Sequence, residues 1–192
     1  MQTALEILQK YWKHEAFREP QDQIINSVLE GKDTFALLPT GGGKSICFQV
    51  PALAMDGICI VVTPLIALMK NQVENLKAKG IKAVAIQTGM NRNEIDSTLD
   101  NCIYGDIKFL YISPERLTST LFLERAKKMK VALLAVDEAH CVSQWGYDFR
   151  PTYLKIANFK LVIPNAKFIA LTASATKEVK EDIIEKLNFK KI

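Results

Sequence analysis

A glycine-rich stretch near the N-terminus, LLPTGGGKSICF at residues 37–48, has the residue types that bind the phosphates of a nucleotide. Its three consecutive glycines allow a tight backbone turn whose N–H groups point inward. The helix expected to begin at Lys44 and Ser45 favours an anion at its N-terminus. The Lys44 ammonium can reach β- and γ-phosphates, and the Ser45 hydroxyl can bind Mg²⁺. The stretch therefore predicts a phosphate-binding loop.

This stretch departs at one position from the strict pattern G-x-x-x-x-G-K-[ST], because Leu38 stands where the first glycine belongs. The alternative is a glycine-rich turn in an ordinary connection between a strand and a helix. The apolar run before the loop, the helix-like segment after it and the intact GKS sequence at 43–45 favour the phosphate-binding interpretation.

An acidic pair, Asp137 and Glu138, follows the apolar run at residues 131–136. We expect Asp137 at the end of a strand adjacent to the first strand, where it would hold Mg²⁺, and Glu138 where it can orient or deprotonate an attacking water. A solvated acidic pair in a loop is the alternative for this dipeptide taken alone. Together with the lysine loop, the pair predicts a nucleotide site with Mg²⁺.

The elements that must position these residues are short apolar, β-branched runs that alternate with helix-like segments. The predicted strands are residues 34–38, 58–62, 83–87, 108–112, 131–136 and 168–172. Between the second and third lies a segment, 64–80, with apolar residues at helical spacing and a stop signal at Gly80. Strands that are apolar throughout indicate a parallel sheet covered by helices on both faces, so the fold class is an α/β open sheet.

Polar clusters with glycine or proline follow five of the six predicted strands. They read PTGGGKS, TPL, SPER, DEAH and TASAT. In open α/β sheets the ligand crevice lies outside the carboxyl ends of the strands. We therefore expect these five loops to converge on one edge of the sheet.

Length and composition set broad bounds on the function. The 192 residues are the size of one domain, and the net charge of +4 is too small to identify a nucleic-acid binder by itself. We expect no membrane span, because no apolar run approaches about 18 residues, and an intracellular location, because the first residues have no signal layout. The four cysteines are widely spaced, so we expect free thiols and no zinc.

Five motifs carry a resemblance to a known family. In this order and at these intervals, PTGGGKS, TPLIALMKNQ, SPERL, DEAHCVSQWGYDFRP and LTASAT resemble the motif series of superfamily 2 helicases, and most closely the RecQ family of DNA helicases. The resemblance runs from FREPQ at 17–21 to LTASAT at 171–176. DEAH is shared with many RNA helicases, and SQWGYDFRP narrows the match to RecQ. Leu38 also fits, because helicases of this superfamily commonly lack that first glycine.

The resemblance implies a RecA-like P-loop domain that uses ATP and Mg²⁺, from a helicase that unwinds DNA 3′ to 5′ in repair and recombination. Residues 1–192 would be its first motor domain, with the second motor domain in cis and the zinc-binding and winged-helix parts absent from this chain. The implied partners are single-stranded DNA and single-strand/duplex junctions, with a monomer acting in the cytoplasm and nucleoid, or in a nucleus. Alternatives are an RNA helicase, a nucleotide- and DNA-binding module with little catalysis, or a P-loop phosphotransferase.

The resemblance also implies how the nucleotide is bound. Gln21 resembles the adenine-reading glutamine, whose amide can pair with the adenine N6 amine and N7. The residue that stacks on adenine aligns with His14, and Trp12 is a second candidate. The expected nucleotide-binding residues are His14, Arg18, Gln21, Thr40, Gly41, Gly42, Gly43, Lys44 and Ser45. The expected catalytic residues are Lys44, Asp137, Glu138 and His140, with Ser45 and Asp137 holding Mg²⁺.

The aromatic stretch QWGYDFRP at 144–151 is expected to bind single-stranded DNA, because flat side chains stack on bases regardless of sequence. Burial beneath the loop is the alternative; we assign Trp145 to DNA and Phe149 to partial burial. In the family this loop couples DNA binding to ATP hydrolysis, and Tyr147 replaces its commonest histidine. The expected DNA-binding and coupling residues are Thr63, Pro64, Lys70, Gln144, Trp145, Tyr147, Phe149, Arg150, Thr172 and Ser174.

Overall fold

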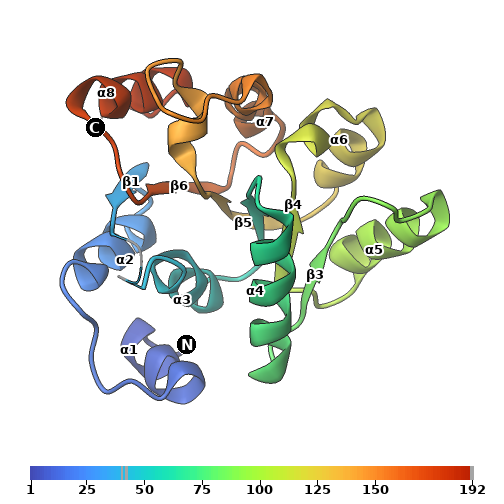
Figure 1. Ribbon diagram of the computed structural model, residues 1–192. Coiled ribbons are helices and arrows are strands. Elements are labelled where there is room, and N and C mark those ends of the chain that lie inside the picture. Colours follow the sequence, from blue (N-terminus) through green and yellow to red (C-terminus); the bar gives the residue numbers. More distant parts are fainter. Residues whose placement is uncertain (40, 42, 191–192) are drawn as a thin grey trace.

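A parallel sheet with helices on both faces forms the centre of the protein in a computed structural model that describes residues 1–39, 41 and 43–190 (Figure 1). Within this part of the chain the strands are β1 (Thr34–Leu37), β2 (Ile58–Val62), β3 (Ala83–Ala85), β4 (Phe109–Ile112), β5 (Val131–Val136) and β6 (Lys167–Thr172). Their order across the sheet is β1-β6-β5-β2-β4-β3, and every neighbouring pair is parallel. The predicted strands and the α/β open-sheet class are confirmed.

The strand order corrects one prediction, that the strand before the acidic pair is adjacent to the first strand. The strand that pairs with β1 is β6, in the register Thr34↔Ile169, and β6 pairs on its other side with β5. β5 is thus separated from β1 by one strand. The apolar runs predict that these segments are strands. Which strands pair depends on the connections between them, and the runs carry no information about those connections.

Helices cover the sheet in two groups that follow the chain order. The first contains α1 (Ala4–Ile7), the π-helix η1 (Leu8–Trp12), α2 (Gln21–Leu29), α3 (Ile46–Ala54) and α4 (Ile66–Ala78). The second contains α5 (Arg92–Tyr104), α6 (Thr120–Ala126), α7 (Ile156–Val162) and α8 (Lys177–Lys186). Short 3₁₀ turns are η2 (Pro114–Thr118), η3 (Ala139–Val142) and η4 (Pro151–Lys155).

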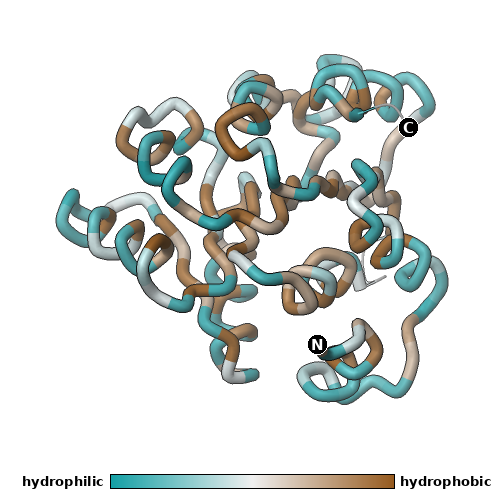
Figure 2. Tube along the Cα trace, turned by 180° about the vertical axis from the view of Figure 1, so that it is seen from behind, coloured by the Kyte–Doolittle hydropathy of each residue, from teal (hydrophilic) through white to brown (hydrophobic). Residues whose placement is uncertain are grey.

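Two hydrophobic clusters, one on each face, hold α2 to α8 to the sheet, and a third joins α1 and η1 to α2 and α3. Side chains of α2, α3 and α4 pack with one face of the strands, and those of α5 to α8 pack with the other. β2 lies between both groups and is buried along its whole length. Apolar residues are accordingly concentrated on the strands at the centre of the molecule (Figure 2). Burial on both faces explains why the strands are apolar throughout instead of alternating.

Two helix ends bear on the predictions. α3 begins at Ile46, with Ser45 as its N-cap residue, so the helix starts slightly later than the expected Lys44 and Ser45. α4 ends at Ala78, and Gly80 follows with a φ of +81°, as expected of a glycine stop. The four cysteines are free and buried, as predicted. In the described residues no helix is both long and apolar enough to cross a membrane.

Candidate nucleotide and nucleic-acid site

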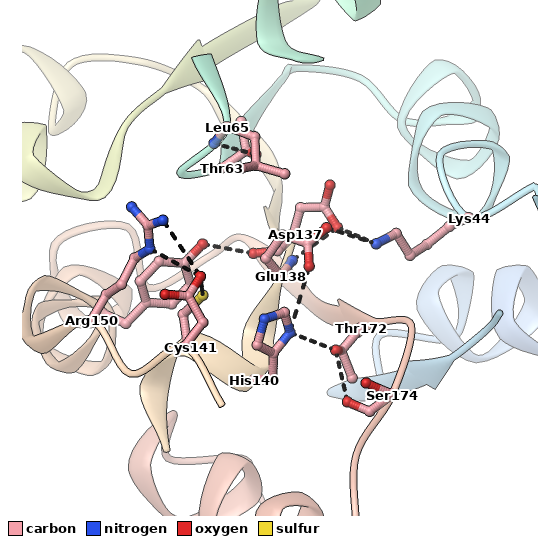
Figure 3. A network of polar contacts seen from close by, with 12 residues as sticks. Lys44, Thr63, Leu65, Asp137, Glu138, His140, Cys141, Arg150, Thr172 and Ser174 are labelled. Atoms are coloured by element: carbon pink, nitrogen blue, oxygen red, sulfur yellow. Dashed lines mark hydrogen bonds and ion pairs between the residues drawn. The ribbon is translucent and has the colours of Figure 1, made fainter. Parts of the chain in front are cut away.

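Lys44 and the acidic pair meet at the carboxyl edge of the sheet, as Figure 3 shows. The Lys44 Nζ atom lies 3.0 Å from Oδ1 of Asp137 and 3.2 Å from Oε1 of Glu138. Asp137 directly follows β5, and its backbone N–H donates to the carbonyl of Val62 in the neighbouring strand (2.9 Å). Glu138 has a left-handed backbone (φ +52°, ψ +44°) and donates its N–H to Oδ1 of Asp137 (2.9 Å). This turn brings both carboxylates to one lysine.

The Lys44–Asp137–Glu138 group is largely shielded from water, with side-chain exposures of 20%, 7% and 17%. Burial acts to lower the pKa of Lys44, but the charges and hydrogen bonds of the two carboxylates outweigh it, and the pKa is raised. Lys44 is therefore charged at neutral pH. The arrangement is a cation held between two carboxylates.

Ser45 and Asp137 supply the donor atoms expected for Mg²⁺. The Ser45 hydroxyl makes no capping hydrogen bond to α3 although Ser45 is the N-cap residue, and Asp137 offers a carboxylate that is almost wholly buried. Oxygen donors of this kind suit Mg²⁺, which is commonly held by one or two protein groups together with phosphates. The residues present thus fit the ion.

Gln21 connects the start of α2 to the predicted phosphate-binding loop. It is 3% exposed; its Oε1 accepts from the backbone N–H of Arg18 (2.9 Å), and its Nε2 donates to the carbonyl of Gly43 (3.2 Å). Gly43 has a φ of +74°, and a Cβ atom there would lie 2.2 Å from Nε2 of Gln21. The positive φ therefore favours glycine at this position, and a Cβ atom there would displace the Gln21 amide.

The structure separates the two candidates for stacking on adenine. Trp12 is half-buried and packs against the hydrophobic clusters, with Nζ of Lys79 at 5.8 Å from its ring centroid. His14 and Arg18 are exposed. Of the two candidates, His14 is thus the more exposed. The predictions for Thr40 and Gly42 fall outside the described residues, and Gly41 has a φ of +83° with open space around it.

His140 links the acidic pair to the end of β6. Its Nδ1 lies 2.8 Å from Oγ1 of Thr172 and 3.5 Å from Oε2 of Glu138. The Thr172 hydroxyl donates its proton to the carbonyl of Ser174 (3.2 Å), so it must accept from His140, which places a proton on Nδ1. Burial, partly offset by the charge of Glu138, lowers the pKa of His140, so the ring is neutral at neutral pH.

The aromatic loop contacts this network through one ring. Tyr147 stacks on His140 with ring centroids 4.7 Å apart and an interplanar angle of 18°. Trp145 and Tyr147 are 78% and 77% exposed, whereas Phe149 is half-buried, as expected. The backbone N–H of Arg150 donates to the carbonyl of Cys141 (2.8 Å) and closes the loop. A base stacked in this loop would thus be one side chain away from His140.

Other expected DNA-contacting residues are distributed between surface and interior. Pro64 is half-buried, and Gln144, Lys70 and Ser174 are exposed. Thr63 is 3% exposed, and its hydroxyl accepts from the N–H of Leu65 (3.4 Å); Thr172 is fully buried against His140. Both threonines are buried and their hydroxyls bond to other residues of the protein. The exposed surface at these two loops is therefore formed by neighbouring residues. Arg150 pairs with Asp148 at 3.4 Å.

Tyr153 is a site residue that the sequence reasoning missed. It is fully buried, and its hydroxyl donates to the backbone carbonyl of Asp137 (2.8 Å). The bond fixes the chain where β5 turns into the acidic pair. Its position two residues beyond the aromatic stretch is the available signal in the sequence, but nothing in the local pattern shows a contact 16 residues away.

Comparison with known proteins places this site in a family. Residues 18–182 match the DEAD/DEAH box helicase family. The chain is 40% identical over 190 residues to the ATP-dependent DNA helicase RecQ of Haemophilus influenzae, covering 99% of this chain and 31% of the relative. It is 45% identical over 193 residues to the RecQ of Bacillus subtilis, covering 100% and 33%. The chain thus spans about a third of the length of these relatives.

A solved structure supports the fold. The helicase MrfA in its DNA-bound form superposes with a TM-score of 0.75 at 16% identity, over 96% of this chain and 28% of that one. The phosphate loop, the DEAH residues at 137–140 and the RecA-like sheet fit the sequence match. The chain therefore belongs to the DEAD/DEAH box helicase family, and within it is similar in sequence to the RecQ helicases.

Proposed function

We propose that this chain is the ATP- and single-stranded-DNA-binding motor domain of a RecQ-type DNA helicase. The observation that carries the proposal is the contact between Lys44 and the acidic pair, joined through His140 to the exposed loop of Trp145 and Tyr147. The proposed phosphate site and the proposed aromatic DNA-binding surface are then joined by direct side-chain contacts. The RecQ relatives and the DNA-bound MrfA neighbour support the choice of DNA.

Nucleotide binding would begin with an exchange of partners at Lys44. In the structure its ammonium is held by Asp137 and Glu138. When phosphate oxygens arrive, Lys44 turns to them, as the lysine of a phosphate loop does. Glu138 would then be free to orient and deprotonate the attacking water, and Ser45 and Asp137 would be the residues that hold Mg²⁺. The ion, when bound, neutralises charge on the phosphates.

The neutral ring of His140 would couple the nucleotide site to the aromatic DNA-binding loop. It touches Glu138 on one side and Tyr147 on the other. A base that displaces Tyr147 on stacking against the loop would therefore alter the support of Glu138. By this route DNA would change the rate of hydrolysis through contacts already present in the chain.

The wider protein belongs to the same proposal. Residues 1–192 would form the first of two RecA-like motor domains, acting as a monomer on single-stranded DNA and junctions inside the cell, in the cytoplasm and nucleoid or in a nucleus. Among the described residues no arginine pairs with Asp137 or Glu138. Since an arginine finger contributes about 10³–10⁵ in rate, we expect slow hydrolysis and no unwinding by the 192-residue chain alone.

Steady-state ATP hydrolysis by this chain tests the proposal, measured with no nucleic acid, with oligothymidylate and with oligouridylate. We expect oligothymidylate to raise a slow basal rate and oligouridylate to raise it less. Glu138→Gln should abolish both rates while retaining ATP binding. Stronger stimulation by oligouridylate would indicate an RNA helicase, and hydrolysis indifferent to either polymer would favour a phosphotransferase; either result would overturn the proposal.

A further inference from the structure

A hydrogen-bonded series of three side chains crosses the interior between α3 and α4. The Nε2 of Gln49 on α3 donates to the hydroxyl of Tyr111 on β4 (2.9 Å), and that hydroxyl donates to Oε1 of Gln72 on α4 (2.7 Å). A phenol has one proton to give, and here it goes to Gln72, so the bond from Gln49 uses its acceptor side. The three groups thus form a directed series.

This series lies within apolar surroundings. Tyr111 is fully buried and Gln49 is 5% exposed, and Tyr111 belongs to the hydrophobic cluster that joins α2, α3 and α4 to the sheet. Burial raises the pKa of Tyr111 well above its ordinary value, so the hydroxyl keeps its proton throughout the physiological range. A buried polar group without its partner is unfavourable, so each helix is constrained to stay in reach of the phenol.

The two ends of the series belong to different parts of the proposed site. The N–H of Gln49 donates to the carbonyl of Ser45 (2.9 Å), so Gln49 lies one turn along the helix that the phosphate loop begins. Gln72 lies on the helix that starts just after Thr63 and Pro64, where the DNA backbone is expected. Both helices pack on the same face of the sheet (Figure 1).

Tyr111 also stands on the strand that supports the DNA-side loops. It pairs in register with Val61 on β2, which in turn pairs with Ala135 on β5. Thr63 directly follows β2, the strand next to β4, and its N–H donates to the carbonyl of Ile112 (3.0 Å). The phenol therefore projects from β4 toward two helices that each begin at an expected binding loop.

We propose that Tyr111 is a positioning residue that links DNA binding at the Thr63–Pro64 loop to the placement of Lys44 and Ser45, through Gln49 and Gln72. This inference rests on the proposed function and adds a second route beside that of His140 and Tyr147. A shift of α4 on binding DNA either carries α3 with it through the phenol or breaks a buried hydrogen bond. Because the linkage is reciprocal, nucleotide must affect DNA affinity by the same factor.

The test is the binding of the fluorescent nucleotide mant-ADP with Mg²⁺ by the whole chain, with and without saturating oligothymidylate. In the wild-type protein we expect oligothymidylate to change the Kd of mant-ADP by at least about fivefold. In Tyr111→Phe this factor should fall to within about twofold of unity, while each ligand alone still binds. Val73→Ala, a truncation in the same apolar cluster, is the matched control: it should lower the Tm but keep the wild-type factor.

Gln72→Leu removes only the hydrogen bond between Tyr111 and α4. Because Gln72 is half-buried, this variant can replace Tyr111→Phe in the test if Tyr111→Phe does not fold. Gln72→Leu should remove the coupling factor in the same way. The inference would be overturned if both variants kept the wild-type change in the Kd of mant-ADP. It would also be overturned if oligothymidylate bound to the wild-type protein without changing that Kd. A wild-type chain that binds neither mant-ADP nor oligothymidylate would instead refute the proposed function.

Discussion

The Nζ atom of Lys44 lies 3.0 Å from Oδ1 of Asp137, although β6 separates β1 and β5, the strands that precede these two residues. Lys44 and Asp137 therefore meet across the end of β6. Lys44 is held by the same carboxylate that is expected to hold Mg²⁺. Nucleotide without Mg²⁺ has to compete with Asp137 for the lysine, whereas the ion would satisfy the carboxylate.

Asp137→Asn should therefore change the affinity for ATP in opposite directions with and without the ion. In EDTA the variant should bind ATP about fivefold more tightly than the wild type, the effect of removing a competing ion pair worth about 1 kcal/mol. With Mg²⁺ it should bind more weakly, because a ligand of the ion is lost. Isothermal titration in the two buffers measures this. Asp106→Asn, at an exposed pair with Lys82, should change neither affinity.

Gln21→Ala should reduce the preference for ATP over other nucleoside triphosphates, because the amide is the group expected to read adenine. In this structure that amide bonds to Arg18 and Gly43, so the variant should also loosen the phosphate loop and weaken all nucleotides to some extent. Competition assays against mant-ADP separate the two effects. Gln23→Ala, exposed on the same helix, is the control. Unchanged selectivity in Gln21→Ala would mean that adenine is read elsewhere.

Trp145→Ala should weaken binding of oligothymidylate by about 5- to 150-fold, the range for losing one stacked base at about 1–3 kcal/mol. Its Tm should not change, because the side chain is 78% exposed. Tyr104→Ala removes an aromatic ring that is 80% exposed at the end of α5, and it should leave both quantities unaltered. A large fall in the Tm of Trp145→Ala would show that the residue contributes to the core instead of to DNA binding.

Lys160→Met should destabilise the fold by about 3 kcal/mol, because it leaves the buried carboxylate of Asp33 without its cation. Lys160 Nζ lies 3.1 Å from Asp33 and also donates to the carbonyls of Leu187 and Asn188 at the end of α8. Urea denaturation measures the loss. Lys130→Met, which breaks the exposed pair with Asp56, should leave the urea midpoint unchanged. Equal effects of the two substitutions would contradict this assignment.

The fold class and the meeting of Lys44 with the acidic pair could be predicted because the sequence signals for them are local. Continuous apolar runs mark strands buried on both faces, and polar clusters after parallel strands must meet at one edge. Lys44 and Asp137 follow from that rule without the strand order. The order itself, with β6 between β1 and β5, could not be predicted, because the runs look alike and pairing is decided by crossovers.

Long-range hydroxyl contacts account for most of what the sequence did not reveal. Thr172 has the residue type that binds DNA phosphates, yet its hydroxyl bonds inside the protein to His140, 32 residues away. Tyr153 and Tyr111 are polar groups within apolar segments, and their partners lie 16 and 39 or more residues away. No periodicity encodes such pairings.

The central claim is that Lys44 forms a nucleotide site with the acidic pair, and equilibrium binding of mant-ATP with Mg²⁺ to Lys44→Ala tests it most directly. Circular dichroism should first show that the variant is folded, and Lys32→Ala, an exposed lysine just before β1, is the control. The account predicts that Lys44→Ala binds at least about tenfold more weakly than the wild type, since a charge-assisted contact to phosphate is lost. An affinity equal to that of the wild type in the folded variant would contradict it.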